Sequence, residues 1–100
     1  MTAFAVGVDV NLKIVDLLGG EQMKPEFLKI NRQHNVPTID DNGFHLNESR
    51  AICAYLVNQY GQKVAQLYPE DAELRGLIDE CLNFDASVLF PSFRDTYVKL

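Results

Sequence analysis

The 100-residue sequence has no tryptophan and only two cysteines, Cys53 and Cys81. Two cysteines are too few for a disulfide framework, and because neither belongs to a C-x-x-C pair, a dithiol redox site is not encoded. Basic residues are also few, with nine Lys and Arg against 14 Asp and Glu and a net charge of −5. This excess of acid argues against nucleic acid or an anionic membrane as the main partner.

Long apolar runs are absent as well. No stretch approaches the ~20 residues that cross a bilayer, and the N-terminus lacks the basic start and apolar core of a secretory signal. We therefore expect a cytoplasmic location and no membrane partner. Neither His34 nor His45 has metal-ligand spacing with the other or with a cysteine, so no metal site is expected. Hydrophobic residues at 47% and charged residues at 23% are typical of a globular domain.

Breaker residues and apolar periodicity predict a mixture of helices and strands. Residues 1–6 are expected to form the end of a helix that stops at Gly7. Asn11–Leu18 is rich in apolar and β-branched residues, which favours a strand. Lys24–Ile30 is expected to be a short helix, with a proline near its first turn.

The central part of the sequence predicts a hairpin followed by a helix. Val36–Asp40 and Phe44–Leu46 are expected to be strands, joined by a turn at Asp41-Asn42-Gly43. Asn and Gly tolerate positive φ, so this triplet is a strong hairpin signal. Ser49–Tyr60 then shows the apolar spacing of a helix.

A linker, Gln62–Glu70, leads to a longer helix. Asp71 is placed to cap its N-terminus, and apolar residues recur at helical steps from Leu74 to Leu89. Pro91 is expected to kink this helix or to end it.

Two neighbouring features suit a small peptide-like ligand that carries a carboxylate. A cis bond before Pro37 would let the N–H and C=O of Val36 pair with a peptide group of the ligand, whereas a trans Pro37 would simply begin an edge strand. The helix N-terminus at Ser49 offers unpaired amides and partial positive charge to a carboxylate or phosphate. The alternative is that Ser49 only caps its own helix.

Other polar residues near these features have two interpretations each. Glu48 can pair with a ligand ammonium group or be a solvated surface charge, and His34 can reach a ligand carboxylate or be an ordinary loop residue. Cys53 and Cys81 fall among apolar helix positions, which predicts core residues rather than nucleophiles.

The order and spacing of several stretches resemble the N-terminal domain of a cytosolic glutathione transferase, especially of the insect delta and epsilon classes. The stretches are Gly19–Ile30, Gln33–Thr38, Asp41–Phe44, Glu48–Ile52, Tyr55–Val57 and Leu67–Pro69, and Asn83–Pro91 resembles the first helix of that family's C-terminal domain. The resemblance implies an α/β fold with an incomplete thioredoxin-like domain at 1–62, which lacks its first strand. A linker at 63–70 and a truncated all-helical domain at 71–100 would follow.

The resemblance also implies that glutathione is the co-substrate, with no further cofactor, and it favours the cis form of the bond before Pro37. Val36 would pair with the cysteinyl unit, Glu48 and Ser49 would hold the γ-glutamyl end, and His34 would reach the glycyl carboxylate. Phe90 and Phe93 would line the hydrophobic-substrate pocket. The implied glutathione-binding set is His34, Val36, Pro37, Glu48, Ser49 and Arg50.

The implied activity is conjugation of glutathione to hydrophobic electrophiles, a detoxification reaction of a homodimeric protein. No residue here matches the catalytic serine of the family, so no catalytic residue is assigned and the chain looks like a fragment whose own activity is in doubt. Asn47 stands where the family usually has tryptophan, which removes apolar packing just before the site. A non-catalytic binding or assembly module is the alternative function.

Overall fold

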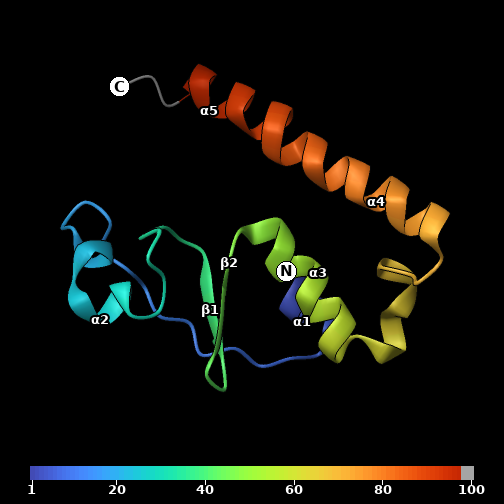
Figure 1. Ribbon diagram of the computed structural model, residues 1–100, viewed down its shortest axis with the longest axis horizontal. Helices are drawn as coiled ribbons and strands as arrows, with labels where there is room; N and C mark the ends of the chain where they lie inside the picture. The colour runs from blue at the N-terminus through green and yellow to red at the C-terminus, as the bar shows by residue number, and fades with distance from the viewer. Residues whose placement is uncertain (98–100) are drawn as a thin grey trace.

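A computed structural model of the chain describes residues 1–97, so the last three residues of the helical part predicted at 71–100 lie outside it. The elements follow one another in a mixed α/β order (Figure 1). They are α1 (Thr2–Val6), a 3₁₀ turn (Glu21–Met23), α2 (Pro25–Leu28), β1 (Thr38–Asp41), β2 (Phe44–Asn47), α3 (Ser49–Tyr60), a 3₁₀ segment (Gln62–Leu67), α4 (Ala72–Phe84), a π turn (Asp85–Leu89) and α5 (Phe90–Tyr97).

The predicted hairpin is confirmed. Strands β1 and β2 pair antiparallel, from Thr38 opposite Asn47 to Asp41 opposite Phe44. Asn42 and Gly43 form the two-residue turn with φ of 52° and 94°, as the primed hairpin turns require.

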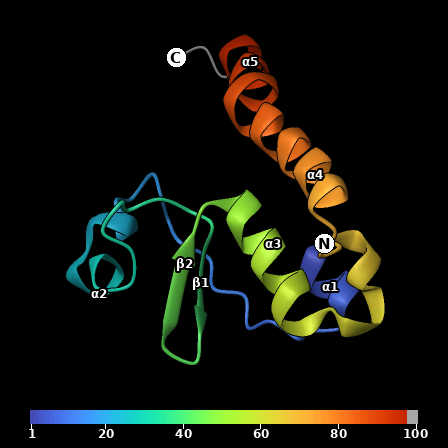
Figure 2. The same ribbon diagram turned by 45° about the vertical axis from the view of Figure 1, so that its right-hand side comes forward.

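Helix α3 carries the small core. Ile52, Leu56 and Val57 are its buried residues, and α1 packs against it (Figure 2). The predicted limits of α3, Ser49 and Tyr60, are those observed. Apolar residues four apart share one face of a helix, which explains why the sequence pattern located this core.

The strand predicted at Asn11–Leu18 is wrong. This segment runs from α1 towards α2 as an extended trace, and the side chains of Leu12 and Ile14 are 82% and 87% exposed. A strand exists only when a neighbouring backbone satisfies its N–H and C=O groups. Within residues 1–97 no strand lies beside this segment, so its apolar side chains remain in solvent.

The linker is bonded to α4 through Arg75 and through Tyr68, whose hydroxyl donates to Oδ1 of Asp79 at 2.7 Å. Nε and Nη2 of Arg75 donate to the carbonyl oxygens of Pro69 and Tyr68, and its guanidinium lies 4.1 Å from the centre of the Tyr68 ring. Asp71 caps α4 as predicted, because its carboxylate accepts the backbone N–H of Leu74 at 3.0 Å.

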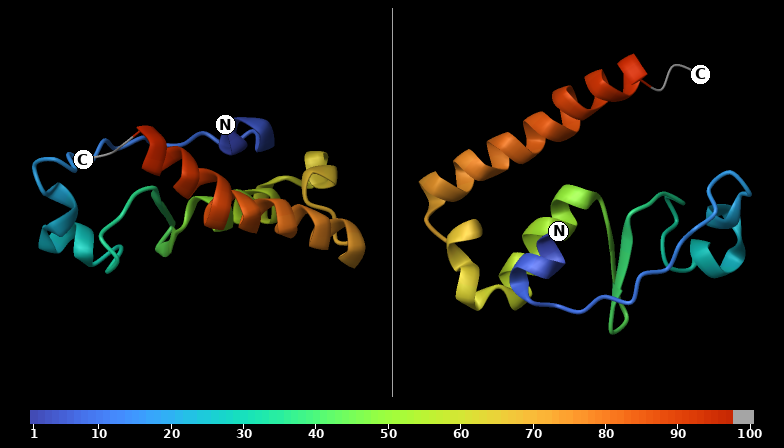
Figure 3. Two further views of the ribbon diagram at one scale, coloured as in Figure 1. Left: turned by 90° about the horizontal axis from the view of Figure 1, so that it is seen from above. Right: turned by 180° about the vertical axis from the view of Figure 1, so that it is seen from behind.

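Of the two outcomes expected at Pro91, a kink or an end of the helix, the helix does not end there. Helix α5 continues to Tyr97, and the π turn at 85–89 comes directly before Pro91 (Figure 3). Proline has no N–H to donate, so a regular i→i−4 ladder is interrupted here in any case. Across the described part of the chain, no helix is long and apolar enough to cross a membrane.

Candidate functional site

The loop before Pro37 is built around one buried side chain. Asn31 is 6% exposed, and its Nδ2 lies 2.9 Å from the carbonyl oxygen of Asn35 and 2.9 Å from Oγ1 of Thr38. Its Oδ1 accepts the backbone N–H of Gln33. The Val36-Pro37 bond is cis, as the resemblance favoured, and β1 begins one residue later.

The start of α3 has an uncommon backbone conformation. Glu48 occupies the N-cap position with φ 72° and makes no side-chain capping bond. Non-glycine residues with positive φ are uncommon and, when present, are often found at functional sites. The interpretation of Ser49 as a simple cap does not hold, because Ser49 is the first helical residue and its hydroxyl accepts a bond from Arg50 at 2.9 Å.

The loop and the start of α3 together line a pocket of about 340 Å³. Six of the eight residues that the sequence singled out lie in its wall, and the lining residues are Asn35, Val36, Pro37, Glu48, Ser49, Arg50 and Phe90. The first amides of α3 have no partner within a helix, so this wall offers N–H donors, a hydroxyl and one acidic side chain.

His34 and Phe93 are not in the wall. His34 is exposed in the loop with φ 46°, and Phe93 lies in α5 with its ring 4.8 Å from that of Tyr97. Asn35, which the sequence did not single out, takes a place in the wall. Its position immediately before Val36 was the signal that could have pointed to it.

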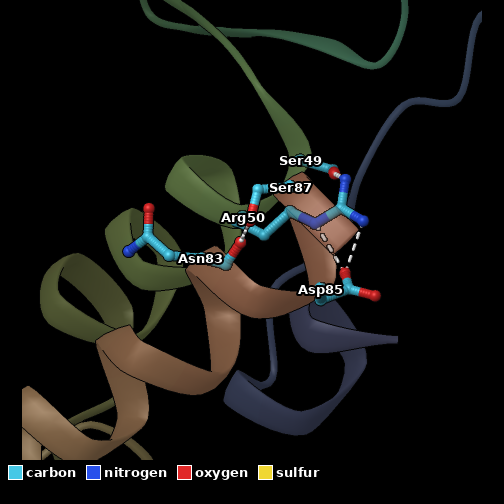
Figure 4. A network of polar contacts seen from close by, with 5 residues as sticks. All are labelled: Ser49, Arg50, Asn83, Asp85 and Ser87. Atoms are coloured by element: carbon cyan, nitrogen blue, oxygen red, sulfur yellow. Dashed lines mark hydrogen bonds and ion pairs between the residues drawn. The ribbon is translucent and has the colours of Figure 1, made fainter. Parts of the chain in front are cut away.

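Arg50 joins the pocket to the long helix (Figure 4). Its Nε donates to Oδ2 of Asp85 at 2.7 Å, its Nη2 also pairs with Asp85, and its guanidinium carbon lies 5.3 Å from the centre of the Phe90 ring. These contacts place Phe90 in the pocket wall, next to the start of α3.

The π turn explains why Asp85 and Phe90 both reach Arg50. In a regular α-helix, residues five apart point in different directions, whereas a π turn hydrogen-bonds residue i to residue i+5. The N–H of Phe90 donates to the carbonyl oxygen of Asp85, so the two residues stack on one face. Pro91 follows this turn directly and has no N–H to donate to a carbonyl oxygen four residues earlier, so the regular hydrogen bonding of an α-helix is interrupted at the π turn.

The two cysteines lie away from this pocket. Cys53 is half-buried in α3 and lines a second, mostly apolar pocket of about 330 Å³ with residues of α1 and α4. Cys81 is exposed, contrary to the expectation of a core residue, because no described element covers that side of α4. Ser87 and Ser92 donate to carbonyl oxygens one turn earlier in their own helix. Among residues 1–97 no group of His, Cys, Asp or Glu could hold a metal ion.

Comparison with known proteins gives consistent matches. Residues 1–58 match the family model "Glutathione S-transferase, N-terminal domain". The chain is similar to a delta-class glutathione transferase of Nilaparvata lugens, with 55% identity, a TM-score of 0.92 and coverage of 97% of this chain and 45% of that one. It is similar to an epsilon-class enzyme of the housefly Musca domestica, with 37% identity, a TM-score of 0.89 and coverage of 97% and 44%.

A third similar structure contains a ligand. It is a glutathione transferase homolog of Drosophila mojavensis with bound glutathione, 40% identical, with a TM-score of 0.84 and coverage of 89% of this chain and 40% of that one. This chain therefore spans less than half the length of each of these three proteins.

Proposed function

Because this chain belongs to the glutathione S-transferase family, with a thioredoxin-like N-terminal part followed by a long helix, we propose that it binds glutathione in the pocket between the Val36-Pro37 loop and the start of α3. The observation that carries this proposal is that Val36 and Ser49, 13 positions apart in the sequence, line the same pocket. One lies in the bend directly before a cis proline, and the other is the first residue of a helix, whose first amides have no partner within the helix.

Each end of the tripeptide has a chemically suited partner in this proposal. The backbone of Val36 pairs with the peptide group of the cysteinyl unit, like an added strand. The first amides of α3 and the hydroxyl of Ser49 bind the γ-glutamyl carboxylate, and Glu48 pairs with its ammonium group. His34 and Arg50 serve the glycyl end, which requires the exposed His34 side chain to turn towards the ligand.

For the whole protein we propose transfer of the glutathione thiol to a hydrophobic electrophile, as in detoxification, by a cytoplasmic homodimer. Such a reaction needs the thiol as thiolate, which a nearby hydroxyl or positive charge favours. We assign no catalytic residue in this chain and give its residues a binding role. Phe90 supplies an apolar wall beside the pocket, and Phe93 would line the electrophile site one turn further along α5. We propose that residues 1–62 form the glutathione-binding domain, that 63–70 are the linker, and that 71–100 belong to the helical domain.

Binding to immobilised glutathione tests the proposed site. We expect the chain to be retained, and we expect Ser49→Ala and Glu48→Ala to weaken binding by about 10-fold each, since each removes a charge-assisted hydrogen bond of about 1.5 kcal/mol. Ser92→Ala is the matched control, because within the described part of the chain that hydroxyl bonds to the carbonyl oxygen of Val88 in its own helix and lies outside the pocket wall. If the wild type and all three variants wash through alike, the proposed site is wrong.

A further inference from the structure

Asn47 occupies a position from which two parts of the site can be held together. It is the last residue of β2, directly before Glu48, and it faces Thr38 across the hairpin. Its Nδ2 donates to Oε1 of Gln33 at 2.7 Å and to Oδ1 of Asn35 at 3.1 Å. The side chain therefore reaches from the strand that leads into α3 to the loop that carries the cis proline.

Asn35 receives amide donors from both sides of its loop. Its Oδ1 accepts from Nδ2 of Asn31 at 2.7 Å and from Nδ2 of Asn47 at 3.1 Å. Its backbone carbonyl accepts from Oγ1 of Thr38 at 2.9 Å. Asn35 lines the pocket and is bonded to Val36, so whatever fixes Asn35 also fixes the backbone of Val36 at the pocket wall.

We propose that Asn47 is a positioning residue that orders the loop 33–36 against the start of α3. The sequence predicted only a loss of apolar packing at this position, whereas the structure has two side-chain hydrogen bonds there. Gln33 has no other side-chain hydrogen bond among the described residues, so its link to the strand depends on Asn47. The consequence for ligand affinity rests on the proposed glutathione site, but the ordering of the loop does not.

Hydrogen–deuterium exchange of the full chain tests the ordering. In Asn47→Leu, which keeps the approximate shape but removes both donors, we expect the hydrogen-bonded amides of Gln33 and His34 to exchange about 10-fold faster, since losing a hydrogen bond raises the population of the open loop by about that factor. The amides of Ile52–Val57 in α3 should not change. Asn11→Leu is the matched control, because Asn11 is exposed and makes no side-chain hydrogen bond within residues 1–97.

Calorimetric titration with glutathione adds the functional readout. We expect the affinity to fall about 10-fold in Asn47→Leu and not in Asn11→Leu, and we expect Gln33→Ala to have less effect in the Asn47→Leu background than in the wild type. Unchanged exchange of the Gln33 and His34 amides, or equally faster exchange throughout α3, would overturn the positioning role. If wild type binds no glutathione while 33–36 still loosens, the positioning role stands and the proposed function fails.

Discussion

Arg50 takes partners from two distant stretches of the chain. It contacts Ser49 beside it and also Asp85 and Phe90 in the long helix. The side chains of Arg50 and Asp85 are 26% and 42% exposed, so water screens their attraction only in part. Such a pair contributes modestly to stability, and it links α3 to the long helix.

Asp85→Ala should therefore lower the free energy of unfolding by about 0.5–1 kcal/mol, and the difference should shrink in high salt. Asp95→Ala is the matched control, because among residues 1–97 the partner of Asp95 is its exposed neighbour Arg94. Urea unfolding at low and high ionic strength measures both. Equal effects of the two substitutions would mean that the Arg50–Asp85 pair has no special role.

Asp41 joins the hairpin turn to α3 through two tyrosines. Its Oδ2 accepts the hydroxyl of Tyr55 at 2.5 Å and that of Tyr60 at 2.6 Å. These two bonds lower the pKa of Asp41. The bond to Asp41, together with desolvation and the charge of that carboxylate, raises the pKa of Tyr55 to about 12.

The sign of each shift gives a pH dependence. The contribution of Tyr55 should be complete below its ordinary pKa of 10.0 and be lost as the pH rises towards 12. The contribution of Asp41 should be lost as the pH falls below its ordinary pKa of 3.8. Tyr55→Phe should therefore be less stable than wild type near neutral pH and lose less stability in alkali, as urea unfolding would show. Tyr97→Phe, at an exposed position, is the control, and parallel alkaline curves for wild type and Tyr55→Phe would contradict this account.

Among the helices and strands, features that depend on neighbouring residues could be predicted from the sequence, whereas the pairing of a strand with a distant strand could not. The turn at Asn42 and Gly43 and the apolar face of α3 depend on residues close in sequence, so the sequence located both. The strand expected at 11–18 depended on a backbone neighbour, which no local pattern can supply.

The site divides in the same way. Val36, Pro37, Glu48, Ser49 and Arg50 were predictable because proline chemistry, helix-start chemistry and a family resemblance all indicate them. The hydrogen bonds of Asn47 were not, because they depend on side chains 12 and 14 residues away.

One substitution should have opposite effects in two elements. Gly43 has φ 94°, and a Cβ there would meet no atom within 4 Å, so only the backbone conformation opposes a side chain. Gly43→Ala should lower the free energy of unfolding by about 1–2 kcal/mol. Gly76 lies inside α4 with open space around it, and Gly76→Ala should raise stability by about 0.5–1 kcal/mol. Thermal melts of both variants measure this, and a change of the same sign in both would contradict the assignment of the turn.

In the molecule as a whole, few apolar side chains are buried in the core and many more are exposed to solvent. Ile52, Leu56 and Val57 are the buried hydrophobic residues among those described, with 7–9% exposure. Large apolar side chains along α4, the π turn and α5 remain exposed, including Leu74, Leu77, Phe84, Val88, Leu89 and Phe93. Hydrophobic burial is the main favourable term in folding, so the margin left to this chain by itself is thin.

We therefore expect the free energy of unfolding of the isolated 100-residue chain to be about 5 kcal/mol or less, with a broad transition. We also expect the chain to self-associate through its exposed apolar side chains and the open edges of its strands. Circular dichroism melts over a range of concentrations, combined with light scattering, measure both properties. A sharp, concentration-independent melt of a monomer would refute this expectation.

The π turn at 85–89 contains one residue more than an α turn that spans the same part of the helix. Compared with a regular α-helix of the same sequence, the side chains after this turn are rotated by about 100° relative to those before it, which is the rotation of one helical residue. Deleting a single residue between Asp85 and Leu89 would leave an ordinary α turn in which Asp85 and Phe90 are four residues apart, so Phe90 and Phe93 would keep their side of the helix relative to Leu74–Leu82. The turn thus accommodates a difference of one residue in length while the aromatic half of the helix keeps its direction towards Arg50.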